Sequence, residues 1–151
     1  MSETPELIAL TRQVVVSHKL DLALVCAVID KESEWDTWAV RYEPDFLSRY
    51  VWPLYRVGKL PLTEAHLRSM SFGLMQVMGQ VAREFGFAGK FLTELCDPRV
   101  GVEFGCRVLA KRLAEHGGIR NAALLAYNGG ADDAYPGQVL ARLPAYSQLL
   151  T

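Results

Sequence analysis

The sequence lacks any hydrophobic run long enough to cross a membrane. Its longest apolar stretch, residues 22–29, is far shorter than the roughly 20 residues of a spanning helix. Residues 1–6 (MSETPE) are acidic and contain no apolar segment of the kind that marks a signal peptide. We therefore expect no membrane insertion and no signal peptide, and a chain that is cytoplasmic when it is made.

An excess of charge of one sign is also missing, as are the spacings of a metal site. The 16 Lys and Arg residues nearly balance the 17 Asp and Glu residues, and no basic block stands out, so we expect no nucleic-acid partner. The three cysteines, Cys26, Cys96 and Cys106, form no CxxC pair, and the three histidines are scattered. These spacings argue against a disulfide framework and a zinc site, and we expect neither a metal nor a cofactor.

Alternation typical of strands is almost absent, whereas helical signals recur along the whole chain. Asp21 and Asp97 are typical helix caps. The predicted helices cover residues 4–18, 22–33, 63–69, 73–85, 98–116 and 119–127, with a last helical piece from 136 that a proline at 144 interrupts. We therefore predict an all-α chain, and a single domain over residues 1–151 because no linker or repeat divides it.

The helix predicted from Leu22 to about Ser33 is apolar on every side as far as Ile29. Such a helix is expected to be central and buried. A buried strand is the competing interpretation, and the length of the segment and the cap at Asp21 favour the helix.

Residues 37–61 are rich in aromatic residues and are broken by prolines and a glycine. This composition predicts a segment with little regular structure. Two interpretations remain open: the segment forms a lid or one wall of a groove, or its aromatic side chains only pack it against the rest of the chain.

Glu32 lies at the carboxyl end of the apolar helix, within residues 31–36 (KESEWD). The helix end carries partial negative charge, and apolar surroundings disfavour an ionised carboxylate, so both effects predict a raised pKa. Cleavage of a glycosidic bond needs a protonated carboxyl, because the leaving oxygen must receive a proton. Taken alone, however, a glutamate at this position is more simply a surface residue at a helix end.

Three segments together resemble the soluble lytic transglycosylases with a goose-type-lysozyme-like domain. Residues 32–36 (ESEWD) resemble the Glu-Ser-x-aromatic-Asn/Asp segment that contains the family's catalytic acid. Residues 71–78 (SFGLMQVM) resemble its Gly-Leu-Met-Gln segment, and residues 126–130 (AYNGG) resemble its Ala-Tyr-Asn-x-Gly segment. The Asp-Pro pair at 97–98 resembles a helix start of the family, and all of these segments occur in the family's order.

The resemblance implies a lysozyme-like helical fold with a substrate groove, and Glu32 as the essential general acid and base. It implies cleavage of the β-1,4 bond between N-acetylmuramic acid (MurNAc) and N-acetylglucosamine (GlcNAc), leaving 1,6-anhydro ends. The substrate-binding residues that it implies are Ser71, Gly73, Met75, Gln76, Tyr127 and Asn128. Gly73 would let the backbone approach the sugar closely, and the Tyr127 hydroxyl would bond either Glu32 or the sugar.

The sequence departs from the family's pattern between the glutamate segment and the Gly-Leu-Met-Gln segment. The family has a short link there, whereas this chain has the long aromatic stretch 37–68. Gly79 stands where the family often has a proline. The serine that the family places near the acid is either Ser69 or Ser71.

A second acid would separate the alternative mechanisms. A transglycosylase uses the 6-hydroxyl of the substrate as nucleophile and needs no second carboxylate. A hydrolase, of the goose-type lysozyme or chitinase kind, activates a water with a second carboxylate, for which Glu43, Asp45 and Asp36 are the candidates. A third alternative is a non-catalytic wall-binding or phage structural domain.

The expected partner is the glycan strand of peptidoglycan, bound by a chain that we expect to be a monomer. Without a signal peptide, the chain would reach the periplasm or cell wall by another route. Phage lysis, delivery with a phage tail and a secretion system are the routes that we consider.

Overall fold

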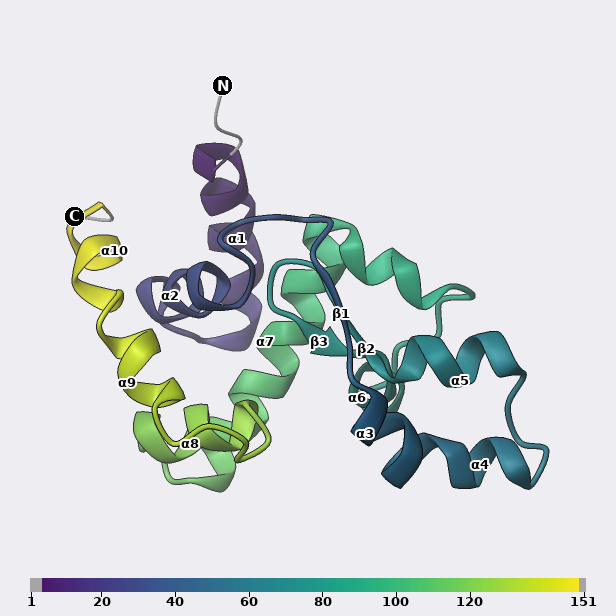
Figure 1. The fold of residues 1–151 in the computed structure, drawn as a ribbon. Coiled ribbons are helices and arrows are strands. Elements are labelled where there is room, and N and C mark those ends of the chain that lie inside the picture. Colours follow the sequence, from purple (N-terminus) through teal and green to yellow (C-terminus); the bar gives the residue numbers. More distant parts are fainter. Residues whose placement is uncertain (1–3, 150–151) are drawn as a thin grey trace.

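The computed structural model describes residues 4–149, and helices make up most of it (Figure 1). The ends of the chain form α1 (Thr4–His18), α2 (Leu22–Ser33), α7 (Pro98–Glu115), α8 (Arg120–Tyr127), α9 (Tyr135–Leu140) and α10 (Leu143–Leu149). The part between α2 and α7 forms α3 (Pro44–Phe46), the π-helix η1 (Leu47–Val51), α4 (Trp52–Arg56), α5 (Leu62–Arg68), α6 (Gly79–Glu84) and the 3-10 helix η2 (Leu92–Cys96). The predicted all-α class is confirmed, and none of these helices is long and apolar enough to cross a membrane.

A small antiparallel sheet is the only extended structure among the described residues. It contains β1 (Val40–Tyr42), β2 (Met70–Phe72) and β3 (Val77–Met78) in the order β1-β2-β3. Val40 pairs with Phe72, which in turn pairs with Val77. The sheet was not predicted, because strands this short carry too few residues for a recognisable alternation.

Helix α2 is the centre of the apolar core, as its sequence predicts. Every residue from Ala23 to Ile29 has at most 5% of its surface exposed. The helix packs against α1, α9 and α10. Asp21 caps it, with Oδ1 accepting a hydrogen bond of 2.9 Å from the backbone N–H of Ala23.

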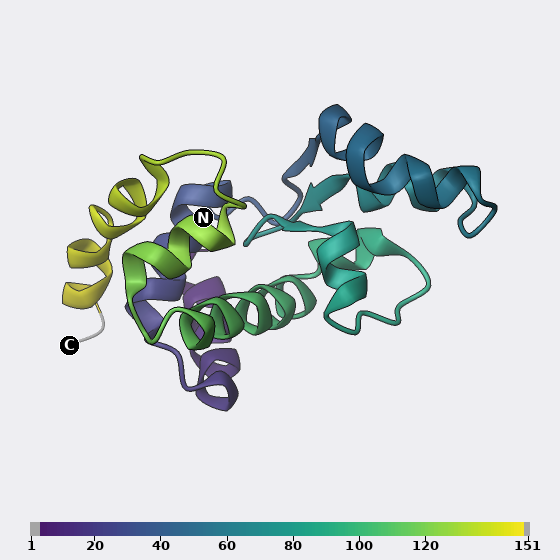
Figure 2. The same ribbon diagram turned by 90° about the horizontal axis from the view of Figure 1, so that it is seen from below.

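Helix α7 runs between two sides of the molecule. Helices α1, α2 and α8–α10 lie on one side of it, and the sheet with α3–α6 lies on the other (Figure 1). Figure 2 shows the same division from below. The carboxyl end of α2 and the first strand therefore face each other across the middle of the fold.

The expectation of little regular structure in residues 37–61 is wrong. The prolines of this segment begin helices instead of breaking them, since Pro44 starts α3 and Pro53 lies in the first turn of α4. Aromatic pairs pack along these short helices. The ring centroids are 5.0 Å apart for Phe46 and Tyr50 and 4.7 Å apart for Trp52 and Tyr55.

The helix predicted over residues 73–85 is wrong in its first half. After β2 the chain makes a tight turn in which Gly73 (φ +69°) and Gln76 (φ +48°) are left-handed, and it then enters β3. A helix cannot continue through two left-handed residues. Only Gly79–Glu84 is helical.

Candidate active site

Glu32 lies in the last turn of α2, beside a sharp reversal of the chain. The helix ends at Ser33, and the next two residues, Glu34 (φ +51°) and Trp35 (φ +68°), are both left-handed. The Ser33 hydroxyl donates a hydrogen bond of 2.9 Å to the carbonyl of Leu74. This bond ties the end of α2 to the turn between β2 and β3.

The carboxyl of Glu32 accepts a hydrogen bond from Tyr135, at the start of α9. The distance from the Tyr135 hydroxyl to Oε1 is 2.6 Å, and the tyrosine is only 2% exposed. Burial and the charge of Glu32 raise the pKa of Tyr135, so its hydroxyl remains a donor. One carboxyl oxygen is thereby fixed, while the other, Oε2, has no hydrogen bond to the described residues.

The pKa of Glu32 is raised, as its position in the sequence predicts. Burial is the largest cause, because it disfavours the ionised form. The hydrogen bond from Tyr135 and the positive charges of Lys31 and Arg41 act in the opposite direction without cancelling it. The raised pKa lets the carboxyl keep its proton to a higher pH than an ordinary glutamate does, which suits a group that acts as both acid and base.

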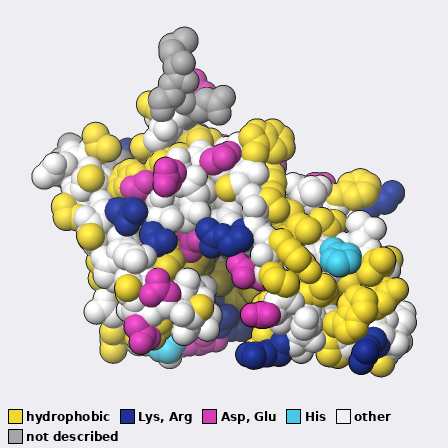
Figure 3. Space-filling view, viewed as in Figure 1, with side chains coloured by type: hydrophobic (Ala, Val, Ile, Leu, Met, Phe, Trp, Pro, Cys, Tyr) yellow, Lys and Arg dark blue, Asp and Glu magenta, His cyan; other side chains and the backbone are white. Residues whose placement is uncertain are grey.

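The groups around Glu32 come from both sides of the fold, since Tyr135 belongs to α9 and Arg41 to β1. Figure 3 shows that the molecule is hollowed between these two sides, with acidic and basic side chains around the hollow.

The resemblance implies that the Tyr127 hydroxyl bonds either Glu32 or the sugar. The structure shows no hydrogen bond between Tyr127 and Glu32. The Tyr127 hydroxyl instead donates a hydrogen bond of 2.7 Å to the carbonyl of Met75. Asn128 accepts a hydrogen bond of 3.0 Å from the backbone N–H of Asp132, which shapes the loop after α8. The tyrosine that bonds Glu32 is Tyr135, a residue that none of the sequence motifs contains.

Gln76 is the centre of a small hydrogen-bonded network. Its amide nitrogen donates to the carbonyls of Ala39 and Gly73, at 2.9 Å each. Its amide oxygen accepts a hydrogen bond of 2.8 Å from the Ser71 hydroxyl. The Gly73 N–H also donates to Ala39, at 2.8 Å. The network fixes the turn between β2 and β3 to the segment that leads into β1.

Met75 is fully buried and packs against Gly105 of α7, where a side chain larger than hydrogen would collide with it. Gly73 has a similar role, because a Cβ there would lie 2.5 Å from the carbonyl oxygen of Leu95. Close packing with α7 and η2 therefore explains why these positions hold glycine. Contact of Gly73 or Met75 with a sugar stays a prediction.

Two of the three candidates for a second acid lie at the start of α3, whereas Asp36 lies before β1 and accepts a hydrogen bond from the Trp38 N–H. Glu43 precedes the helix, and its backbone N–H donates to the carbonyl of Ser69. Asp45 is exposed in the first turn. Neither residue is among the charged groups that shift the pKa of Glu32.

The serines considered as neighbours of the acid bond to other groups. The hydroxyl of Ser69 donates to the carbonyl of Ala65, and that of Ser71 donates to Gln76.

Among residues 4–149, no group of His, Cys, Asp and Glu side chains is arranged to hold a metal ion. Burial raises the pKa of Cys26 and Cys106 to about 12, which makes both thiols poor nucleophiles.

Comparison with known proteins identifies a family for this chain. The family model described as "Transglycosylase SLT domain" matches residues 11–135, a range that begins in α1 and ends at the tyrosine bonded to Glu32. Comparisons with curated proteins and with solved structures gave no match. The chain belongs to the transglycosylase SLT domain family, whose activity is peptidoglycan cleavage of the lytic transglycosylase type.

Proposed function

We propose that this chain cleaves the β-1,4 bond between MurNAc and GlcNAc in peptidoglycan, with Glu32 as general acid and then as general base. The observation that carries the proposal is the Glu32 carboxyl itself. It has a raised pKa caused by burial, and Tyr135 fixes its Oε1 at 2.6 Å. The free Oε2 is the oxygen that would face the glycosidic bond.

The reaction has two proton transfers. Glu32 gives its proton to the glycosidic oxygen as the bond from C1 of MurNAc to that oxygen breaks. The resulting carboxylate then takes the proton of the MurNAc 6-hydroxyl, while the 6-oxygen forms a bond to C1 of the same MurNAc. The product carries a 1,6-anhydro ring, no water is consumed, and Glu32 is again protonated.

The surroundings of Glu32 favour this route over hydrolysis. A hydrolase would need a second carboxylate to activate water, and the charges that act most on Glu32 are the cations Lys31 and Arg41. Glu43 or Asp45 would have to approach the substrate from the start of α3. Arg41 would also stabilise the carboxylate that forms after the first proton transfer.

The remaining candidate residues would position the substrate or the acid. Gln76, Ser71 and Gly73 hold the turn that ties the sheet to the end of α2, and backbone groups of this turn are the ones that we expect to contact sugar. Tyr127 supports the same turn through Met75, and Asn128 would line the groove beside it. We propose a single domain that acts as a monomer without a cofactor and reaches the wall by phage lysis, tail delivery or secretion.

Release of soluble fragments from dye-labelled peptidoglycan sacculi tests this function. We expect the purified chain to solubilise the label, and the fragments to keep their peptides attached to MurNAc, because the bond broken lies in the glycan strand. A chain that binds sacculi but releases nothing would instead be a non-catalytic wall-binding domain. Fragments of free peptide would show that a different bond is cleaved, and either result would contradict the proposal.

A further inference from the structure

Trp38 is the most exposed of the large hydrophobic side chains of residues 4–149, with 78% of its surface accessible. Its backbone is nevertheless held firmly. The Trp38 N–H donates a hydrogen bond of 2.9 Å to Asp36, and the next carbonyl, that of Ala39, accepts bonds from Gly73 and Gln76. An exposed indole on a fixed backbone is typical of a binding surface, because the backbone loses little freedom when a ligand arrives.

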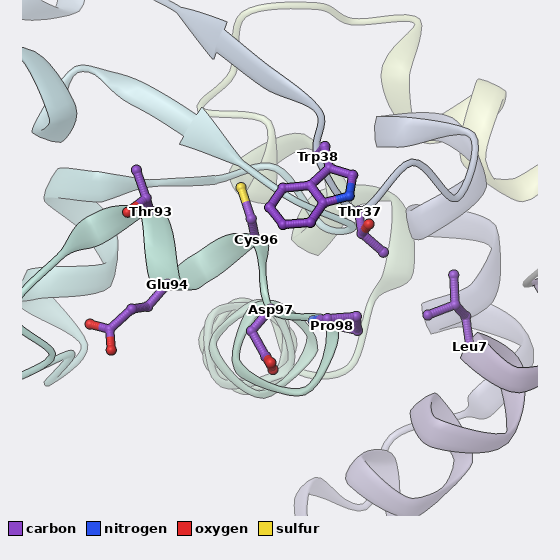
Figure 4. A pocket seen from close by; sticks show the side chains of 8 residues that line it. All are labelled: Leu7, Thr37, Trp38, Thr93, Glu94, Cys96, Asp97 and Pro98. Atoms are coloured by element: carbon purple, nitrogen blue, oxygen red, sulfur yellow. The ribbon is translucent and has the colours of Figure 1, made fainter.

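The indole stands at the edge of a hollow of about 590 Å³, a size within the range of small-ligand sites. Its lining residues come from α1, from the segment before β1, from η2 and from the start of α7: Leu7, Thr37, Trp38, Thr93, Glu94, Cys96, Asp97 and Pro98. Figure 4 shows the ring between Cys96 and Thr37, with Asp97 and Pro98 below it and Leu7 across the hollow.

The lining combines a flat aromatic ring with hydrogen-bonding groups and has no Lys or Arg. Thr37 and Thr93 offer hydroxyls. One carboxyl oxygen of Glu94 accepts from one backbone N–H and one of Asp97 accepts from two, and the other oxygen of each has no hydrogen bond to the described residues. Carboxylates repel anions such as phosphate but accept hydrogen bonds from hydroxyl and amide groups.

These properties fit a sugar that carries an acetamido group. The apolar face of a pyranose ring can stack on the indole, its hydroxyls and amide N–H can donate to the carboxylates, and its methyl group can contact Leu7 and Pro98. A protein partner is less well matched, because the centre of a protein interface is depleted of charged residues, whereas Glu94 and Asp97 are part of the lining of this hollow.

We propose that this hollow is a second glycan-binding site, which holds N-acetylhexosamine units of the peptidoglycan strand away from Glu32. Neither Glu32 nor Tyr135 is among its lining residues, and none of these residues belongs to α9 or β1. The site would keep the chain attached to the insoluble wall between cleavage events. This inference rests on the proposed function for its ligand class.

The test uses the Glu32→Gln chain, which would bind without cleaving, and measures its retention on sacculi and its affinity for a GlcNAc tetramer. We expect the added change Trp38→Ala to weaken retention about tenfold, a common cost of removing a tryptophan anchor. Thr93→Arg should have a similar effect, because a long cationic side chain fills the hollow while Trp38 stays in place. Phe91→Ala is the matched control, since Phe91 is an aromatic side chain 56% exposed outside the hollow.

Equal retention of the Trp38→Ala and Phe91→Ala chains would overturn the proposal. So would normal binding by Thr93→Arg, because the hollow would then not hold the sugar. The two proposals can fail separately. A wild-type chain that releases no fragments but loses retention with Trp38→Ala would refute the proposed catalysis and support this site.

Discussion

Replacing Glu32 by Gln should lower the rate of fragment release by about 10²–10⁴-fold, the usual contribution of a general acid and base. The amide keeps the size of the side chain and can still accept the hydrogen bond from Tyr135, but its N–H protons are not acidic enough to be transferred to the glycosidic oxygen. The measurement is the initial rate of label release from sacculi at saturating and at low substrate. The fall should appear in kcat more than in KM, since the binding groups are unchanged.

Glu34→Gln is the matched control for this change. Glu34 is an exposed glutamate two residues further on, at the left-handed end of α2. We expect its replacement to leave the rate within about twofold, as is usual for surface substitutions away from special contacts. If Glu32→Gln and Glu34→Gln behaved alike, Glu32 would not be the acid.

The same Glu32→Gln variant should be more stable than the wild type at neutral pH. The pKa of Glu32 in the folded chain lies above its ordinary value of 4.5, so the native state binds this proton more tightly than the unfolded state does. The wild type therefore loses stability as pH rises from 4.5 through the raised pKa. The variant avoids this loss, and its gain should be on the order of 1 kcal/mol at neutral pH and vanish in acid. Thermal unfolding across pH measures it.

Tyr135→Phe should move the pH dependence of the reaction. The Tyr135 hydroxyl bonds the ionised form of Glu32 and lowers its pKa against the effect of burial. Without this bond the pKa rises further, so the alkaline limb of kcat/KM should shift upward by about one pH unit. The rate at the optimum should also fall, because the carboxyl is no longer held in one orientation.

Tyr127→Phe separates this effect from simple loss of a buried hydroxyl. It removes a hydroxyl that bonds the carbonyl of Met75, so it should cost about 1–3 kcal/mol of stability and leave the alkaline limb in place. An alkaline limb of kcat/KM that shifted equally in Tyr135→Phe and Tyr127→Phe, or in neither variant, would contradict the role given to Tyr135.

Much of the helical framework could be predicted from local sequence. Helix α2 matches its predicted bounds because it has a clear cap at Asp21 and a long apolar run, and α7 follows the cap and proline at 97–98. The position of Glu32 at the end of a buried helix also predicted that its pKa is raised. These features depend on residues close together in the chain.

The partners of Glu32 could not be found in this way. Tyr135 lies 103 residues further along the chain, and its hydroxyl reaches Glu32 only because α9 packs against α2. The charge of Arg41 acts on the pKa of Glu32 from β1, a strand too short to predict. The turn at 73–76 depends on left-handed residues and on the hydrogen bonds of Gln76. These prevent the helix that the local sequence pattern predicts. No local signal marks any of these contacts.

The products of digestion in ¹⁸O-labelled water test the central claim most directly. If Glu32 acts alone and the MurNAc 6-hydroxyl is the nucleophile, mass spectrometry should find fragments that end in 1,6-anhydro-MurNAc and contain no ¹⁸O. Reducing ends that carry ¹⁸O would show that water attacks C1 instead. That result would contradict the single-acid mechanism and would require a second carboxylate, with Glu43 and Asp45 the first to replace.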